Sequence, residues 1–133
     1  MSQTITATTG GTGSSPVPGI TRYVLIIRTD ESAAVSAEER SWREQQTAAF
    51  QAEQRLRGIS AGGELLQPAQ TATWVRCWPG GDVEVVNRPP AGGNEQISGF
   101  FVMDSVGLRE AIRAGTEVPA AWYGTIEIRP VAQ

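Results

Sequence analysis

The pattern of apolar positions predicts a mixed chain of strands and helices between residues 21 and 131. The first strand is a continuous apolar run at residues 23–27, which is typical of a central strand buried on both faces. A hairpin follows later, because two β-rich runs at residues 71–78 and 83–86 are joined by a Pro-Gly-Gly-Asp turn.

The first helix is predicted to follow a Ser-x-x-Glu capping box at residues 36–39. Behind the box, apolar residues recur at helical spacing, and we expect this stripe to face the core. The stripe consists of Trp42, Ala49, Leu56 and Ile59, with Ala48 and Ala52 beside them. Gly62 and Gly63 predict a break in the chain after the helix.

Two further strands are predicted at residues 96–103 and 123–129, with a second helix starting at residues 104–105. The order is therefore β-α-β-β-α-β, an α+β class with the ferredoxin-like split-βαβ arrangement, to which a short extra strand could be added. Residues 1–19 are rich in Ser, Thr, Gly and Pro and predict a flexible tail, so the domain spans residues 20–133.

Both helices of such a fold lie on one face of the sheet, so the other face needs a different cover. Alternation predicts that Val75, Cys77, Ile97 and Phe101 point at the helices. The opposite face then carries Trp74, Trp78 and Phe100. A second copy of the chain is the expected cover, so we expect a homodimer.

Composition excludes several kinds of chemistry. The chain has no histidine, and its 11 basic residues are all arginine, which excludes catalytic triads, histidine metal sites and lysine Schiff bases. The only cysteine, Cys77, excludes an internal disulfide. A net charge of -3 argues against a nucleic-acid partner. No apolar run spans a membrane and no secretory signal is visible, so we expect a cytoplasmic protein.

Four segments together then indicate a family. The strand at residues 23–28, the start of the helix at residues 35–39, the sequence GELLQPAQTAT at residues 63–73 and the sequence YGTIEIRP at residues 123–130 resemble the YCII-related proteins of the DGPF-motif type. That resemblance covers residues 21–131. It implies a dimeric α/β barrel with a small-molecule cavity and cofactor-free chemistry. A regulatory role is also implied, because some members are encoded beside sigma factors.

The signature loop of that family is altered at residues 87–100. The matching positions are Pro89, Ala91, Glu95, Ile97, Gly99 and Phe100, whereas Asn87, Arg88, Pro90 and Asn94 depart from the pattern. The carboxylate and lysine of the family's loop are therefore not carried over. Asn87 and Arg88 either serve a new substrate at the mouth of the cavity or have drifted without function.

Alternation in the last strand places Tyr123, Thr125, Glu127 and Arg129 on one face. Glu127, Arg129 and Tyr123 are the candidate catalytic residues, and no residues are predicted to bind a metal. The candidate substrate-binding residues are Arg28, Trp74, Arg76, Trp78, Asn87, Arg88 and Phe100. Aromatic walls with guanidinium groups suit a planar or anionic ligand. Alternatively, Glu127 and a neighbouring arginine form an ion pair that only stabilises the sheet.

Two functions follow from these residues. The first is a cofactor-free enzyme of secondary metabolism, of cyclase, isomerase or dehydratase type, which orients a small organic molecule while Arg76 or Arg129 polarises a carbonyl group. The second is a non-catalytic ligand-binding, accessory or regulatory protein. An unpaired and shielded Glu127 favours the enzyme, whereas a saturated Glu–Arg pair favours the binding protein.

Overall fold

The computed structural model describes residues 19–87 and 94–132 and shows an α+β domain, which confirms the predicted class. The strands are β1 (Thr21–Asp30), β2 (Ser60–Leu65), β3 (Trp74–Cys77), β4 (Val83–Val86), β5 (Glu95–Ser105) and β6 (Gly124–Pro130). The helices are α1 (Ala37–Leu56) and α2 (Leu108–Glu117), with short 3-10 helices η1 (Ala69–Thr71) and η2 (Pro119–Trp122). Of the predicted tail, all but Gly19 lies outside the described residues. Within them, no helix is long and apolar enough to cross a membrane.

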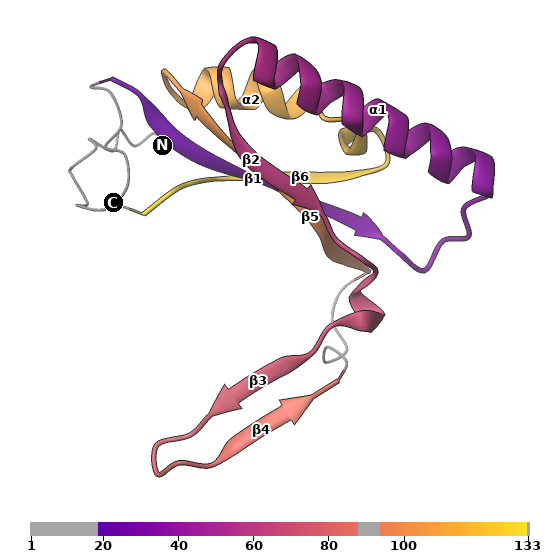
Figure 1. Cartoon of the computed structure of the whole chain (residues 1–133), viewed down its shortest axis with the longest axis vertical. Helices are drawn as coiled ribbons and strands as arrows, with labels where there is room; N and C mark the ends of the chain where they lie inside the picture. Colours follow the sequence, from indigo (N-terminus) through magenta and orange to yellow (C-terminus); the bar gives the residue numbers. More distant parts are fainter. Residues whose placement is uncertain (1–18, 88–93, 133) are drawn as a thin grey trace.

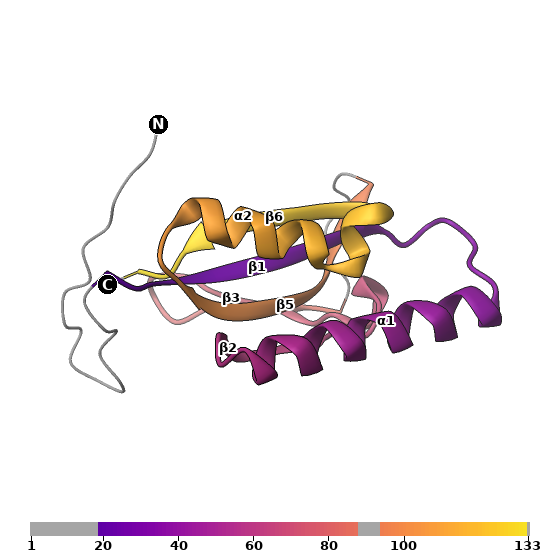
Figure 2. The same cartoon turned by 90° about the horizontal axis from the view of Figure 1, so that it is seen from above.

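Four strands form an antiparallel sheet in the order β2-β5-β1-β6, and both helices cover the same face of it (Figures 1 and 2). The core fills the space between the sheet and the helices. Its most buried apolar side chains include Leu25, Ile27, Phe101, Met103, Ala111 and Val118. Fully burying one large apolar side chain contributes about 1.5–3 kcal/mol, so this layer supplies most of the stability.

The sheet face away from the helices is called the open face below. It carries Val24, Ile26, Phe100 and Val102 at its centre, and each of these side chains is half-buried. Central strand β1 therefore buries only its helix-side residues Tyr23, Leu25 and Ile27. The prediction that this strand is buried on both faces is wrong for a single chain.

Strand β2 corrects the prediction that Gly62 and Gly63 break the chain. Both glycines lie inside this edge strand, which pairs with β5. Gly63 has a φ of 144°, and a Cβ atom there would lie 2.5 Å from the carbonyl oxygen of Phe100. The absence of a side chain thus lets β2 approach β5 closely.

The predicted hairpin exists, but it stands outside the main sheet. Strands β3 and β4 pair only with each other, and they project away from the sheet on the side opposite the helices (Figure 1). Residues 74–86 are called the arm below. Trp74 and Trp78 therefore do not share a sheet face with Phe100, and Val75 and Cys77 are exposed and do not point at the helices.

Helix α1 begins as predicted, because the Ser36 hydroxyl accepts a hydrogen bond from the backbone N–H of Glu39. Its core-facing side differs from the prediction. The buried residues are Thr47, Phe50 and Gln54, whereas Trp42 is 50% exposed and Leu56 is 85% exposed. The ring of Phe50 packs against that of Phe101, with 5.1 Å between centroids, and this aromatic contact sets the rotation of the helix.

Candidate functional site

Three charged side chains meet on the open face. Strands β1 and β6 pair so that Ile26 lies opposite Glu127 and Arg28 lies opposite Thr125. The Nε and Nη2 atoms of Arg28 are each 2.9 Å from Oε1 of Glu127. The Nε atom of Arg129 donates to the other carboxylate oxygen. The predicted placement of Glu127 and Arg129 on one face is confirmed.

This cluster restricts what Glu127 can do. Hydrogen bonds from Arg129 and then from Arg28 hold the pKa of Glu127 below its usual range. The carboxylate is therefore ionised near neutral pH and cannot act as a general acid. Both of its oxygens accept hydrogen bonds from guanidinium groups, so it is also a weak base. Glu127 is saturated, which is the arrangement that favours the binding protein over the enzyme.

The lowered pKa predicts how Glu127 affects stability. Its folded pKa lies below its unfolded pKa, so the stabilisation is complete above the unfolded pKa and is lost as pH falls through the folded one. We expect Glu127→Gln to lower the melting temperature near neutral pH. We also expect the melting temperature of this variant to fall less steeply than that of the wild type as the pH is lowered. Melting temperatures between about pH 7 and pH 3 test this. Glu44→Gln, at an exposed position of α1, is the control. The prediction would be contradicted if the melting temperatures of Glu127→Gln and the wild type fell equally steeply as the pH is lowered.

A cavity that contains two predicted site residues, Arg28 and Trp74, lies at the base of the arm, at the end of the open face. It has a volume of about 480 Å³ and is called the Arg28 pocket below. Among the described residues that line it, Arg28 is the one charged residue and Trp74 the one aromatic residue. The other lining residues are Leu66, Gln67, Pro68, Ala69, Thr71, Ala72, Gln96 and Ile97. An apolar wall with a few placed polar groups is typical of a small-molecule site.

A bulge in β5 creates one wall of the Arg28 pocket. Ile27 pairs with Gly99 but Arg28 pairs with Ile97, so Ser98 is an extra residue in the strand. The bulge turns Ile97 to the open face beside Arg28. The prediction that Ile97 points at the helices is wrong, because counting alternate residues back from Phe101 does not allow for the extra residue Ser98.

Hydrogen bonds fix the opposite wall. The carboxylate of Glu31 accepts a hydrogen bond of 2.8 Å from the backbone N–H of Ala69. The hydroxyl of Thr71 donates to the carbonyl oxygen of Pro68 at 2.7 Å. The segment around η1 is thus held to the end of β1, and the pocket is largely formed before a ligand enters.

The structure brings together only part of the predicted site. Arg28 and Trp74 line the pocket, and Glu127 holds Arg28 from the neighbouring strand. Phe100 lies on the open face between Ile26 and Glu64 but does not line the pocket. Arg76 and Trp78 lie along the arm, with the Arg76 guanidinium 5.3 Å from the Trp78 ring centroid. Asn87 is exposed after the arm, and Arg88 lies outside the described residues.

Tyr123 is a correction, because it lies on the helix side of the sheet. The guanidinium carbon of Arg43 on α1 is 3.6 Å from the centre of its ring, and burial raises the pKa of its hydroxyl. Tyr123 is the residue between η2 and β6, so the alternation that places Thr125 and Glu127 does not extend to it. The three candidate catalytic residues therefore do not form one site.

The sequence interpretation missed most of the pocket wall. Leu66, Gln67, Pro68 and Ala72 carry the family resemblance, yet they were not among the candidate site residues. Their position in a Pro-containing loop between two strands was the available signal, because loops on a rigid scaffold often carry binding residues.

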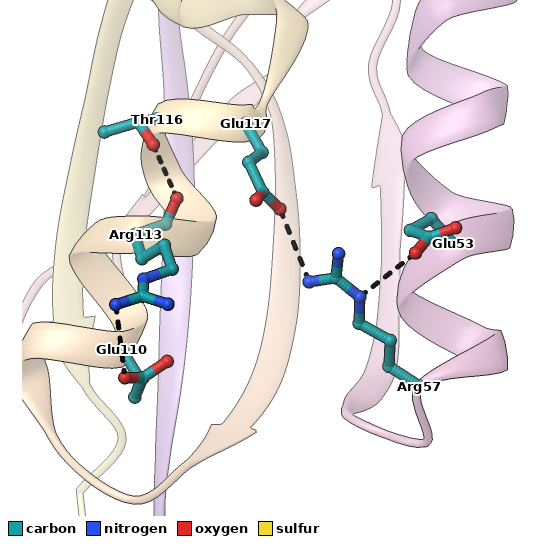
Figure 3. A network of polar contacts seen from close by, with 6 residues as sticks. All are labelled: Glu53, Arg57, Glu110, Arg113, Thr116 and Glu117. Carbon is teal, nitrogen blue, oxygen red and sulfur yellow. Dashed lines mark hydrogen bonds and ion pairs between the residues drawn. The ribbon is translucent and has the colours of Figure 1, made fainter.

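A second hollow, of about 250 Å³, is lined by residues that follow α1, by the end of β5 and by α2. Figure 3 shows the polar contacts of its charged residues. Arg57 bridges the helices here, at 3.1 Å from Glu53 and 3.6 Å from Glu117. Arg113 pairs with Glu110 at 3.9 Å. Both arginines are thus paired with carboxylates of the described residues. Exposed ion pairs of this kind contribute little to stability.

In the part of the chain that the structure describes, no group of three or more Cys, Asp or Glu side chains could hold a metal ion. The chain matches no family model, and no curated protein is significantly similar to it in sequence. The YCII-related resemblance therefore stays a prediction from the residues at 23–28, 35–39, 63–73 and 123–130.

Proposed function

We propose that this chain is a homodimeric small-molecule-binding protein whose ligand is a planar organic anion. The observation that carries the proposal is the Arg28 pocket, where among the described residues a guanidinium and an indole are surrounded by apolar and uncharged polar side chains. The volume of about 480 Å³ lies within the range of small-ligand sites. Neither a cofactor nor a metal is part of the proposal.

The state of Arg28 supports an anionic ligand. Its Nε and Nη2 atoms are bound to Glu127, and within the described residues no acceptor is bound to its Nη1 atom. Its side chain is 33% exposed, so solvent screens its charge less than that of a fully exposed arginine. A carboxylate would receive a charge-assisted hydrogen bond from Nη1, and an aromatic ring could stack on Trp74.

A second candidate function uses the same pocket. The guanidinium of Arg28 is fixed by Glu127 and could polarise a carbonyl group, which suits a cofactor-free cyclase, isomerase or dehydratase in secondary metabolism. The saturation of Glu127 and the position of Tyr123 on the other side of the sheet favour the binding protein.

The sheet order and the uncovered face support the remaining parts of the proposal. The order β2-β5-β1-β6, with both helices on one face, fits the ferredoxin-like arrangement. A second copy over the open face would complete a dimeric α/β barrel. Cys77 is exposed and is the only cysteine of the chain, which fits the reducing cytoplasm.

Arg28→Gln is expected to weaken binding of an aromatic carboxylate by about tenfold or more, because the ligand loses its charge-assisted hydrogen bond. The probe is 1-naphthoate, with 1-naphthamide as its neutral analogue, and binding is measured by calorimetry. Arg109→Gln, at an exposed position of α2, is the control and should bind normally.

Equal binding of the acid and the amide by the wild type would reject an anionic ligand. Unchanged binding by Arg28→Gln would reject the Arg28 pocket as the site. Conversion of a bound compound by the wild type but not by Arg28→Gln would favour the enzyme over the binding protein.

A further inference from the structure

A further hollow lies on the helix side of the sheet, beside the β5 bulge. It has a volume of about 170 Å³ and is called the Arg43 hollow below. The bulge contributes to two separate spaces, because Ile97 lines the Arg28 pocket whereas the extra residue Ser98 lines the Arg43 hollow. Leu66 lines both. The two spaces therefore adjoin, but they present different polar groups to a ligand.

Arg43 is held in place at the wall of this hollow. Its Nε atom donates a hydrogen bond of 3.0 Å to Glu39, one turn earlier on α1. Its guanidinium carbon lies 3.6 Å from the centre of the Tyr123 ring. A guanidinium that lies over an aromatic ring can still donate the N–H groups in its own plane. Within the described residues, no acceptor is bound to its Nη1 and Nη2 atoms. Arg43 is thus a preorganised donor, and its side chain is only 27% exposed.

Two further donors line the Arg43 hollow. Arg40 lies three residues before Arg43 on α1, so the two guanidinium groups occupy neighbouring positions on one helix face. The structure shows no ion pair or hydrogen bond between Arg40 and any described residue. The Ser98 hydroxyl accepts a hydrogen bond of 3.1 Å from Thr29, so its own proton is left for another acceptor. Two neighbouring positive charges repel each other, and an anion between them would remove that cost.

We propose that the Arg43 hollow binds a compact tetrahedral oxyanion, of which inorganic phosphate is the simplest case. The groups that hold the ion are the guanidinium groups of Arg40 and Arg43 and the hydroxyl of Ser98. Guanidinium groups suit phosphate because each can donate two parallel hydrogen bonds to its oxygens. The volume of about 170 Å³ favours a compact ion, since sites for drug-sized ligands measure about 300–1,000 Å³. This site goes beyond the proposed function and uses neither Arg28 nor Trp74.

The charges around the hollow favour an anion by a small margin. Glu44 is the one acidic residue among the described lining residues, so together with the two arginines it leaves the lining a net charge of +1. Glu39 lies outside the hollow and offsets part of the charge of Arg43. Burial raises the pKa of Tyr123, so this residue adds no negative charge near neutral pH. The balance makes Glu44 a sensitive position, because removing its charge should strengthen anion binding.

The full chain is titrated with inorganic phosphate and, separately, with methyl phosphate, and binding is followed by phosphorus NMR line widths. Sodium chloride keeps the ionic strength constant. Arg40→Gln is expected to weaken phosphate binding by about tenfold, because a charge-assisted hydrogen bond is lost. Glu44→Gln is expected to strengthen it by about threefold. Arg55→Gln is the matched control and should bind like the wild type, since Arg55 is also exposed on α1 but does not line the hollow. Tighter binding of methyl phosphate would identify a phosphate ester as the ligand, and tighter binding of phosphate the free ion.

A wild-type chain that binds neither phosphate nor methyl phosphate would overturn the proposal. Equal weakening by Arg40→Gln and Arg55→Gln would also overturn it, because the ion would then respond only to the overall charge of the surface. Arg28→Gln is expected to bind phosphate normally, and loss of phosphate binding in this variant would place the ion in the Arg28 pocket instead. Naphthoate binding depends on Arg28 and phosphate binding on Arg40, so the failure of one site is distinguishable from the failure of the other.

Discussion

Replacing Gly63 by alanine is expected to lower the free energy of unfolding by about 4 kcal/mol, one of the largest effects available to a single substitution in this chain. A Cβ atom at Gly63 would lie 2.5 Å from the Phe100 carbonyl oxygen and 2.8 Å from the Cα atom of Phe101. Both contacts are with backbone of β5, so relief would require β2 to move away from the sheet. Chemical denaturation monitored by tryptophan fluorescence measures the change.

Gly62→Ala is the matched control for this prediction. Gly62 also has a positive φ, of 129°, but no atom lies within 4 Å of the position of its Cβ. This variant therefore carries the backbone strain without the collision and should lose only about 1–2 kcal/mol. Equal losses for the two variants would show that strain, and not the close approach of β2 to β5, explains the effect.

Phe50→Ala is expected to cost about 3–5 kcal/mol, because it removes a buried ring that packs against Phe101 between α1 and the sheet. Trp42→Ala removes a larger side chain from the same helix. Trp42 is 50% exposed, so this second change should cost less than about 1 kcal/mol. Thermal and urea unfolding of both variants measure the difference. A greater loss for Trp42→Ala would mean that the apolar stripe predicted from the sequence is the true core face.

The elements that could be predicted are those in which local chemistry and burial agree. Strand β1 has a continuous apolar run at residues 23–27, the Ser36 cap starts α1, and the Pro-Gly-Gly-Asp turn closes the hairpin. In these segments each local preference is consistent with the tertiary structure, so the pattern alone is enough to place them.

The rotation of α1 could not be predicted, because the side of the helix that packs on the sheet is mostly polar. The stripe of Trp42, Ala49 and Leu56 has a regular spacing, but the sheet receives Phe50 with the polar Thr47 and Gln54. Periodicity describes one helix at a time, whereas the choice of face depends on which side chains fit the surface of the sheet. Strand β2 was missed for a related reason. Gly62 and Gly63 lower strand propensity, and the close approach to β5 that requires a glycine at position 63 exists only in the folded sheet.

The sequence could predict which types of residue form the candidate site, but it could not predict how these residues contact one another. Alternation correctly joined Glu127 to Arg129, since both lie within a regular strand. It could not show that Arg28 occupies the same carboxylate, because that contact depends on the pairing of β1 with β6, which are 99 residues apart at these positions. The pocket wall could not be predicted either, because it is built from a loop and a bulge, which have no regular sequence period.

The bulge at Ser98 also determines where this chain can change in length. Deletion of one residue from a regular strand inverts every side chain on one side of the deletion. Deletion of Ser98 would instead restore regular pairing and leave Ile97 beside Arg28, because Ser98 is the extra residue. Insertions and deletions are therefore least disruptive at this point of β5. Since a bulge also increases strand twist, such a change would redirect the chain that leads to the arm while the ligand-facing wall kept its residues.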